Sequence, residues 1–271
     1  MSIFKSALRR AFAAFLSRKQ RRKLGAFILN EADSDGNGDA ATNGEYAFLQ
    51  NFVGNLKSAP CVAIDAGANV GSWSLEFLKL APKQSRVLAF EPAVKTYERL
   101  CQNLASDSRA TPVNAALSDT TGEGSLHLAG ELCGTNSIHR QNIFQDGKCA
   151  DEKIRLVTGD AFCSERGIQK IDFIKIDTEG HELAVMRGFD NMLSNKLIGA
   201  IQFEYGGTWL DARIQLADAF TYLQSKGYAM AKIYPNGLKY IECYDQSMDT
   251  FKYANFAAVL PKLGSGFAEI A

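Results

Sequence analysis

The sequence lacks the features that mark membrane-spanning, secreted or zinc-finger proteins. No apolar run approaches the ~20 residues that a membrane-spanning helix needs. The six cysteines form no CxxC pair, so no zinc spacing is present. We identify no signal-peptide pattern in the sequence. We therefore expect reduced cysteines and a cytoplasmic protein.

A net charge is missing as well. Thirty basic and thirty acidic residues cancel, so the whole chain gives no reason to expect nucleic-acid binding. Neither a GxSxG nucleophile motif nor a phosphate-binding P-loop occurs. The apolar fraction of 46% is that of an ordinary globular protein, and 271 residues are enough to bury a sizeable core.

The N-terminal segment departs from this balance. Eight Lys or Arg residues and no acid fall within residues 1–23, where apolar residues recur at helical spacing. The pattern predicts a basic amphipathic helix that packs its apolar face on the main domain. Peripheral contact with an anionic membrane surface is the alternative.

A polar, Gly-rich stretch at residues 30–44 follows. Its acids resemble the start of a calcium-binding loop, but Gly44 stands where the twelfth position requires a glutamate. We therefore expect a solvated loop. The chain divides into an N-terminal helix and polar loop at 1–45 and one larger domain at 46–271.

Strand and helix patterns alternate through the larger domain. Short apolar runs predict strands at 61–65, 86–91, 111–116, 153–158, 171–177, 198–205, 228–234 and 256–260. Helices are expected at 71–80, 92–104, 179–187 and 210–226, with a hairpin or loop excursion at 122–138. Such alternation is typical of an α/β fold with a mainly parallel sheet and helices on both faces.

The first strand ends in DAGANVG, residues 65–71. Gly67 and Gly71 permit positive φ and close backbone approach, and Asn69 tolerates the left-handed conformation. Ligands of open α/β sheets bind at this edge. A dinucleotide site would carry GxGxxG and receive a negative pyrophosphate, which Asp65 would repel. The sulfonium and ammonium of S-adenosylmethionine suit Asp65 better.

Two further strand ends complete the predicted nucleoside site. Glu91 ends the second strand and can accept hydrogen bonds from ribose hydroxyls. Dehydrogenases also bind ribose hydroxyls through a carboxylate at this position, so Glu91 alone indicates only an adenosine ligand. A purely structural alternative is that the helix dipole favours a carboxylate at the N-terminus of the next helix. The third strand is followed by Ser118 and Asp119, where we place the adenine, although a plain turn explains these two residues nearly as well.

Acids and one histidine follow the next two strands. The run KIDTEGHE carries Asp177, Glu179 and His181, and Glu204 stands near the end of the neighbouring strand. A neutral imidazole can take the proton of an acceptor hydroxyl, so His181 is the predicted base; packing or capping is its structural alternative. Glu179, Glu204 or water could take the proton instead. Asp177 and Glu204 could share a hard cation such as Mg²⁺.

Together, VAIDAGANVGSWS, FEP, NAALSD and IDFIKIDTEGHE closely resemble FkbM-type methyltransferases, over residues 61–260. The resemblance implies a class I methyltransferase (Rossmann-like) three-layer fold with a mainly parallel, seven-stranded sheet. It implies O-methylation of a hydroxyl on a sugar, glycan or natural product. It also implies S-adenosylmethionine as donor, held by Asp65, Gly67, Asn69, Gly71 and Glu91. An NAD-dependent oxidoreductase and a non-catalytic protein that binds an adenosine ligand stay open as alternatives.

Overall fold

A single large sheet organises the domain. The computed structural model describes residues 5, 12, 14–56, 59–130, 134–139, 150–264, 267 and 269–270. Within these ranges the sheet has the strand order β10-β9-β11-β8-β7-β1-β2-β3. Strand β11 runs antiparallel between β8 and β9, β10 runs antiparallel to β9, and the other strands are parallel. The strands are β1 (Val62–Ala66), β2 (Arg86–Phe90), β3 (Ala110–Val113), β7 (Ile171–Ile176), β8 (Ile198–Tyr205), β9 (Ala229–Tyr234), β10 (Gly237–Ile241) and β11 (Ala254–Val259).

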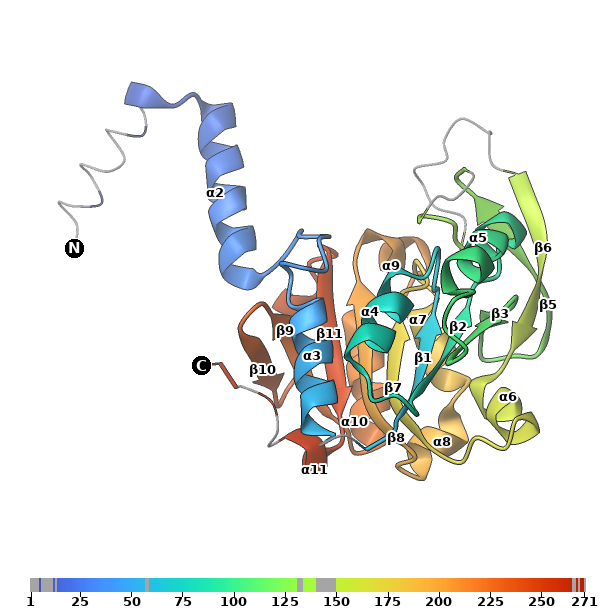
Figure 1. Ribbon diagram of the computed structural model, residues 1–271. Coiled ribbons are helices and arrows are strands. Elements are labelled where there is room, and N and C mark those ends of the chain that lie inside the picture. The colour runs from blue at the N-terminus through green and yellow to red at the C-terminus, as the bar shows by residue number, and fades with distance from the viewer. Residues whose placement is uncertain are drawn as a thin grey trace.

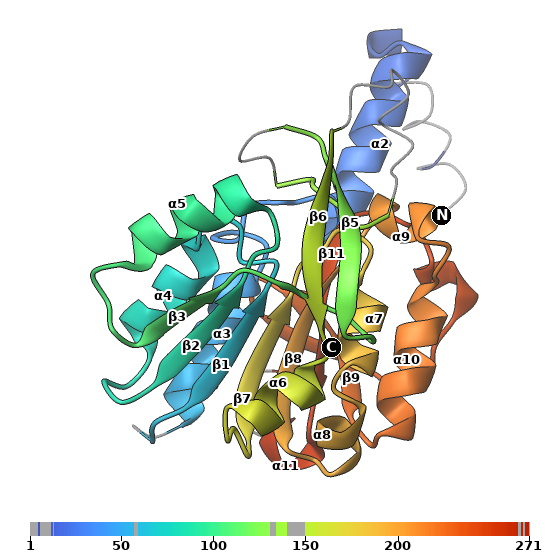
Figure 2. The ribbon, with the colours of Figure 1, turned by 90° about the vertical axis from the view of Figure 1, so that its right-hand side faces the viewer.

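Helices cover both faces of the sheet because successive strand residues point to opposite sides. In β1, Ala63 belongs to one apolar core and Ile64 to the other. One face is covered by α3 (Glu45–Asn55), α4 (Ser72–Leu80) and α5 (Val94–Leu104). The other is covered by α6 (Gly159–Glu165), α7 (Glu182–Arg187), α8 (Asp190–Ser194) and α10 (Leu216–Ser225) (Figures 1 and 2). This arrangement confirms the three-layer α/β class I methyltransferase fold.

The sheet holds one strand more than the seven expected. Strand β10 forms a hairpin with β9, in which Tyr234 pairs with Gly237 across the two loop residues Pro235 and Asn236. Only Leu238 of this strand is fully buried. A strand at the edge of a sheet needs few apolar residues, which is why the apolar pattern did not reveal it.

The predicted strand at 111–116 is divided between two sheets. Strand β3 ends at Val113, and β4 (Ala116–Leu117) joins β5 (Gly122–Leu128) and β6 (Ala150–Val157) in a separate sheet of order β4-β6-β5. The side-chain amide of Asn114 donates to the carbonyls of Glu91 and Pro92, at 3.0 and 2.9 Å. These bonds hold the chain where it turns from one sheet to the other.

Two helix boundaries also differ from expectation. The predicted helix at 210–226 is interrupted between α9 (Gly207–Asp211) and α10, because Arg213 adopts a left-handed φ of 59°. The predicted helix at 179–187 begins only at Glu182, because Glu179 and Gly180 have φ values of 54° and 98°. The second difference matters for function, because it places Glu179 in a turn at the edge of the sheet.

Helix α2 (Arg18–Asp33) projects from the domain (Figure 1). None of its residues is buried. The apolar positions expected to pack on the domain fall within residues 3–16, most of which lie outside the described ranges, so that packing stays a prediction; Phe15, which is described, is 85% exposed. The helix also extends into the expected polar loop, and ends where Ser34 adopts a φ of 54°. No described helix combines the length and apolarity needed to cross a bilayer.

The described cysteines, Cys61, Cys101, Cys163 and Cys243, are free thiols. Cys61 and Cys163 are buried among apolar neighbours, and burial raises the pKa of both thiols. They are structural residues of the core rather than nucleophiles. Cys133 and Cys149 lie outside the described residues.

Candidate functional site

The turn that follows β1 presses against the end of β7. Gly67 has φ +79°, and a Cβ at this position would lie 1.8 Å from the carbonyl oxygen of Asp177. Asn69 has φ 48° and Gly71 has φ +91°, so the predicted left-handed positions are confirmed. Only glycine permits the contact at residue 67, and the turn is thereby fixed over the carboxyl edge of the sheet.

Glu91 is tied to this turn by its carboxylate. Its Oε2 accepts from the backbone N–H of Asn69 at 3.0 Å, and its Oε1 accepts from the N–H of Ala93 at 2.9 Å. Each carboxylate oxygen has a second lone pair that can accept from a bound hydroxyl. Burial raises the pKa of Glu91 to about 7, although both backbone bonds oppose the shift. Glu91 therefore changes charge near neutral pH.

A first cavity opens beside Glu91. Gly67, Asn69, Asp177 and His181 lie along its rim, and its empty volume is about 550 Å³, the solvent at its mouth included. Most of its walls are apolar, contributed by Phe90, Pro92, Ala116, Leu117, Leu126 and Ile138. A largely apolar cavity that also presents carboxylates, Glu91 among them, suits a flat heterocycle that carries a hydroxylated ring.

Asp65 lines neither this first cavity nor the second cavity that is described below. It is fully buried, and its Oδ2 accepts from the Ser74 hydroxyl at 2.7 Å. Asp65 pairs in register with Lys175 of β7, so the two side chains lie on the same face of the sheet. Burial raises the pKa of Asp65. Asp65 lies beneath the turn and is absent from the lining of both cavities, so its direct contact with the donor stays a prediction.

Lys175 is the buried cation of this region. Its Nζ lies 2.8 Å from Oδ2 of Asp177. Although burial alone would lower it, the carboxylates of Asp177, Glu45 and Asp65 raise the pKa of Lys175 well above its ordinary value. Among the described residues, one lysine therefore faces three carboxyl groups.

A second cavity adjoins the first and shares Gly67, Asn69, Asp177 and Glu179 with it. Its empty volume is about 1030 Å³, again with open solvent included. Its charged and aromatic lining residues are Glu45, Tyr46, Trp73, Lys175, Asp177, Glu179, Glu204 and Tyr253. Acids and aromatic rings thus line the space beyond Glu91.

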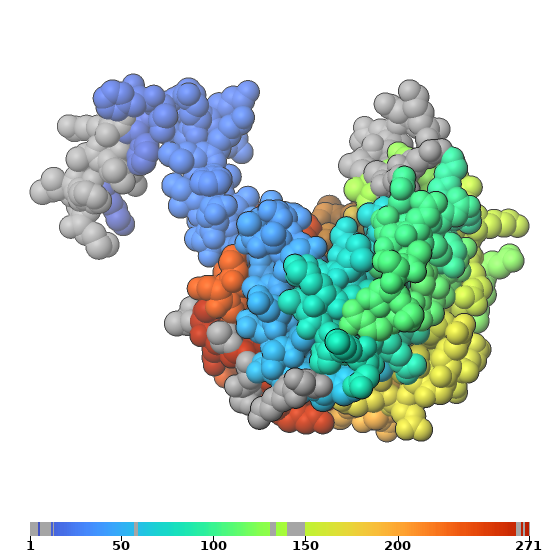
Figure 3. Space-filling view, in the orientation of Figure 1, coloured from blue at the N-terminus to red at the C-terminus, as the bar shows by residue number. Residues whose placement is uncertain are grey.

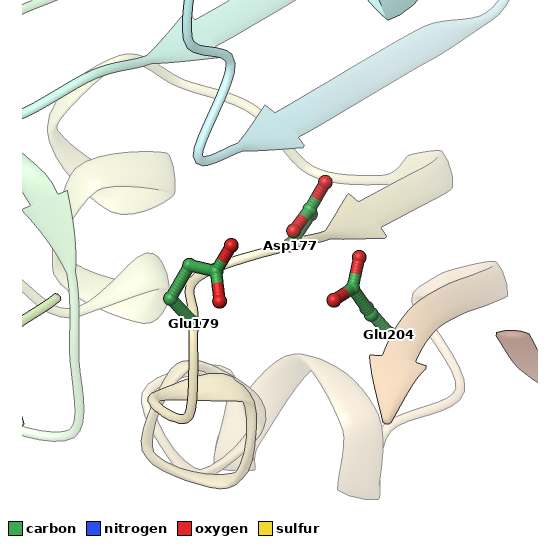
Figure 4. A group of neighbouring side chains, drawn as sticks. All are labelled: Asp177, Glu179 and Glu204. Atoms are coloured by element: carbon green, nitrogen blue, oxygen red, sulfur yellow. The ribbon is translucent and has the colours of Figure 1, made fainter. Parts of the chain in front are cut away.

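Three acids converge within this second cavity. Asp177 follows β7, Glu179 lies in the next turn, and Glu204 stands near the end of β8; Figure 4 shows their carboxylates pointing toward one another. One oxygen of each lies within 4.8 Å of the others. Burial, reinforced by the neighbouring acids, raises the pKa of Glu179 to about 8 and that of Glu204 well above its ordinary value. The sequence predicted Asp177 and Glu204 together, and the structure adds Glu179.

His181 lies on the first cavity and not on the second. Its Nε2 is 3.0 Å from the Ser118 hydroxyl, and its Nδ1 is 3.1 Å from Nε2 of His139. Burial and the neighbouring His139 ring lower the pKa of His181 to about 4, so it is neutral at physiological pH. Ser118 is buried behind His181, whereas Asp119 is exposed; neither lines a cavity.

Sequence reasoning missed two contributors to the cavities. The segment 134–139 covers the first cavity, and the Ser137 hydroxyl donates to the backbone carbonyl of Glu179 at 2.7 Å. No local pattern predicts that contact, which spans 42 residues of chain. Glu45 and Tyr46 begin α3 and line the second cavity. Burial raises the pKa of Glu45 to about 6, and an acid at the start of an apolar helix was the available signal.

Comparison with known proteins finds methyltransferases among the relatives of this chain. The methyltransferase sdnD of Sordaria araneosa is 32% identical over 166 residues, which cover 51% of this chain and 63% of that protein. The 2-O-methyltransferase NoeI of Sinorhizobium fredii is 29% identical over 153 residues, covering 51% and 61%. The hexuronic acid methyltransferase AglP of Haloferax volcanii is 26% identical over 156 residues, covering 57% and 61%. The matches span about three fifths of these curated relatives.

A crystal structure of the methyltransferase FkbM from Methylobacillus flagellatus superimposes with a TM-score of 0.47 at 16% identity, over 73% of this chain and 43% of that one. The model of the methyltransferase FkbM domain matches residues 65–230. The matched range contains the glycine turn, Glu91, the three converging acids and His181. The chain belongs to the family of FkbM methyltransferase domains.

Proposed function

We propose that the chain is an S-adenosylmethionine-dependent O-methyltransferase. The observation that carries the proposal is the set of four acids in the second cavity. Glu45, Asp177, Glu179 and Glu204 line it, and Lys175 is the one cation among its described lining residues, directly beside the largely apolar first cavity that contains Glu91. A positively charged ligand would favour the ionised forms of Glu179 and Glu204, whose pKa values burial and the neighbouring acids raise in the free protein. A ligand that joins an adenosine to a positively charged tail matches both cavities.

The same acids disfavour a dinucleotide. NAD carries a negative pyrophosphate next to its ribose, and the cavity beyond Glu91 would set that group among carboxylates. S-adenosylmethionine carries a sulfonium and an ammonium there instead. The alternative of an NAD-dependent oxidoreductase therefore conflicts with the electrostatics, although Glu91 would serve either ligand.

The protein residues divide the work of methyl transfer. Glu91 would accept from the ribose hydroxyls, and the walls around Phe90 and Leu117 would enclose the adenine. The donor, when bound, supplies a methyl group that is already activated for in-line displacement by an oxygen nucleophile. What remains for the chain is to hold the acceptor hydroxyl in line and to take its proton.

Glu179 and Glu204 are better placed than His181 to take that proton. They line the second cavity, whereas His181 lies on the first with both ring nitrogens in hydrogen bonds. A base works best when its pKa lies near the working pH, and the pKa of Glu179 is about 8. We therefore assign proton removal to Glu179 and Glu204. His181 would instead form part of the wall of the first cavity.

A sugar hydroxyl is the acceptor that we propose. The aromatic residues Tyr46 and Tyr253 line the second cavity beside the acids, and aromatic rings with polar groups next to them suit the two faces of a sugar. Two of the relatives are named for a hexuronic acid and for 2-O-methylation. A hydroxyl of a glycan or natural product fits the same description.

Mg²⁺ held by Asp177 and Glu204, with Glu179 as third ligand, stays a prediction. The donor set suits a hard cation, because all three ligands are carboxylates within reach of one point. Lys175, however, already pairs with one oxygen of Asp177. Mg²⁺ at this position would polarise the acceptor oxygen and help the acceptor hydroxyl to ionise.

The experiment that tests the proposal is a methyl-transfer assay with labelled S-adenosylmethionine and a panel of sugars and glycans. We expect label in acceptors with a free hydroxyl, and none in the same acceptors when that hydroxyl is already methylated. Glu204→Gln should abolish most of the transfer. Label that appears on amines or carboxylates, or in no acceptor even though S-adenosylhomocysteine binds, would refute O-methylation.

A further inference from the structure

Helix α2 is largely exposed in the part of the chain that the structure describes. None of its sixteen residues is buried, and Phe27, Ile28 and Leu29 are 61%, 55% and 58% exposed. An isolated helix of this length is only marginally stable in water, and clustered exposed apolar side chains mark interaction sites. The helix therefore lacks, among the described residues, the packing partner that its composition calls for.

Basic residues gather at the outer end of the same helix. Its acid-free first six residues hold Arg18, Lys19, Arg21, Arg22 and Lys23. Residues 1–23 together carry eight basic residues and no acid, although the whole chain balances at thirty of each sign. The rest of the protein therefore holds an excess of eight acidic residues. The charge is segregated, with a strongly positive projection on an acidic body.

The inner end of α2 is fixed to the domain beside the second cavity. Lys252 donates to the side chain of Asn30 at 3.0 Å, Lys232 pairs with Asp35, and the N–H of Gly36 donates to the carbonyl of Tyr253 at 2.7 Å. Both ribbon views show α2 rising on the side of the sheet at which β1, β7 and β8 end (Figures 1 and 2).

Two further observations set the place of α2 relative to the site. Gly38 and Ala40, shortly after the helix, line the second cavity. The space-filling view shows most of α2 clear of the body (Figure 3). The projection therefore stands beside the mouth of the site without obstructing it.

We propose that α2 binds the surface of an anionic lipid membrane. Leu24, Phe27 and Ile28 follow each other at helical spacing and would enter the interface, while the basic residues of the outer turns would contact the headgroups. A nucleic acid would satisfy the charges but not the apolar side chains. A second copy of α2 would bring two positively charged helices together. An anionic lipid surface is complementary to both the charge and the apolar side chains of α2.

This docking would hold the mouth of the second cavity at the membrane. That consequence rests on the proposed methyltransferase function: an acceptor carried on a lipid would then arrive at Glu179 and Glu204 from the surface. The membrane contact itself is independent of methyl transfer, and it is measured without it.

The test is co-sedimentation of the full chain with vesicles. We expect binding to vesicles of phosphatidylserine mixed with phosphatidylcholine, weak binding to phosphatidylcholine alone, and loss of binding as salt is raised. Arg21→Gln with Arg22→Gln should weaken the binding roughly 10- to 30-fold, because each basic residue near such a surface contributes several-fold. The matched control, Lys83→Gln with Arg86→Gln, changes net charge equally on exposed residues near the opposite edge of the sheet and should bind like the wild type.

A second pair of variants tests the apolar contact. Phe27→Ser should weaken vesicle binding severalfold without unfolding the domain, because Phe27 is 61% exposed. Leu197→Ser, exposed at 37% before β8, should leave binding unchanged. Equal binding by Phe27→Ser and the wild type would overturn the proposal. So would a dimer in sedimentation velocity that Phe27→Ser dissociates, without vesicle binding, since that would identify a second copy as the partner.

Discussion

The titration of Glu91 gives the sharpest quantitative prediction. Burial raises its pKa to about 7 in the free protein. Ribose hydroxyls donate to the charged carboxylate, so a protonated Glu91 must lose its proton before S-adenosylhomocysteine binds. Affinity should therefore be constant above pH 7 and fall about tenfold for each pH unit below it, reaching on the order of 100-fold between pH 7 and pH 5. Isothermal titration calorimetry at several pH values measures this dependence.

Glu91→Gln should remove that part of the pH dependence. At pH 8 its affinity should also be about 10- to 100-fold lower, because hydrogen bonds to a charged group contribute roughly 1.5–3 kcal/mol. Glu165→Gln is the control: this residue lies exposed in α6, lines neither cavity, and should leave the affinity and its pH dependence unchanged. If Glu91→Gln has the wild-type affinity and pH profile while remaining folded, Glu91 does not hold the ribose.

Three further predictions concern the chemistry. Glu179→Gln should lower kcat by roughly 10²- to 10⁴-fold, the usual contribution of a general base; wild-type kcat/KM should rise with pH through about 8, as Glu179 loses its proton, and unchanged kinetics in the variant would assign the proton elsewhere. His181→Asn should weaken S-adenosylhomocysteine binding and leave kcat within a few-fold of wild type; a loss of 100-fold or more in kcat at saturating donor would instead make His181 the base. If Asp177 and Glu204 need Mg²⁺, exhaustive chelation should abolish turnover and added Mg²⁺ should restore it, whereas full activity in chelator would show that no metal is required.

Local rules predicted the parts of the site that depend on a single turn. Gly67 and Asn69 are residue types that favour a left-handed backbone, so their conformation was predictable from the sequence. Glu91 was predictable because it stands directly after the end of a strand. Asp177 and Glu204 could be paired in advance, because the carboxyl ends of parallel strands share one edge of the sheet. These inferences needed only the strand boundaries.

Other features depend on contacts between distant segments and were not predictable in the same way. Asp65 lies beneath the turn, where it accepts from the Ser74 hydroxyl and is paired in register with the buried Lys175; the sequence of one strand does not reveal its register with another. Glu179 lies near the other acids because its positive φ places it in a turn before α7 begins. The hydroxyl of Ser137, 42 residues earlier in the chain, donates to the backbone carbonyl of Glu179. Helix α2 keeps its apolar side chains exposed, which the amphipathic pattern alone argues against.

The central claim is that the two adjoining cavities bind the methyl donor rather than a dinucleotide. Calorimetry of the wild-type chain with S-adenosylhomocysteine and with NADH tests it directly. We expect saturable binding of S-adenosylhomocysteine at one site per chain and no measurable binding of NADH. We also expect Glu179→Gln with Glu204→Gln to weaken the binding of S-adenosylmethionine, because the variant lacks two of the acids that would face the sulfonium. Binding of NADH without binding of S-adenosylhomocysteine would contradict the central claim.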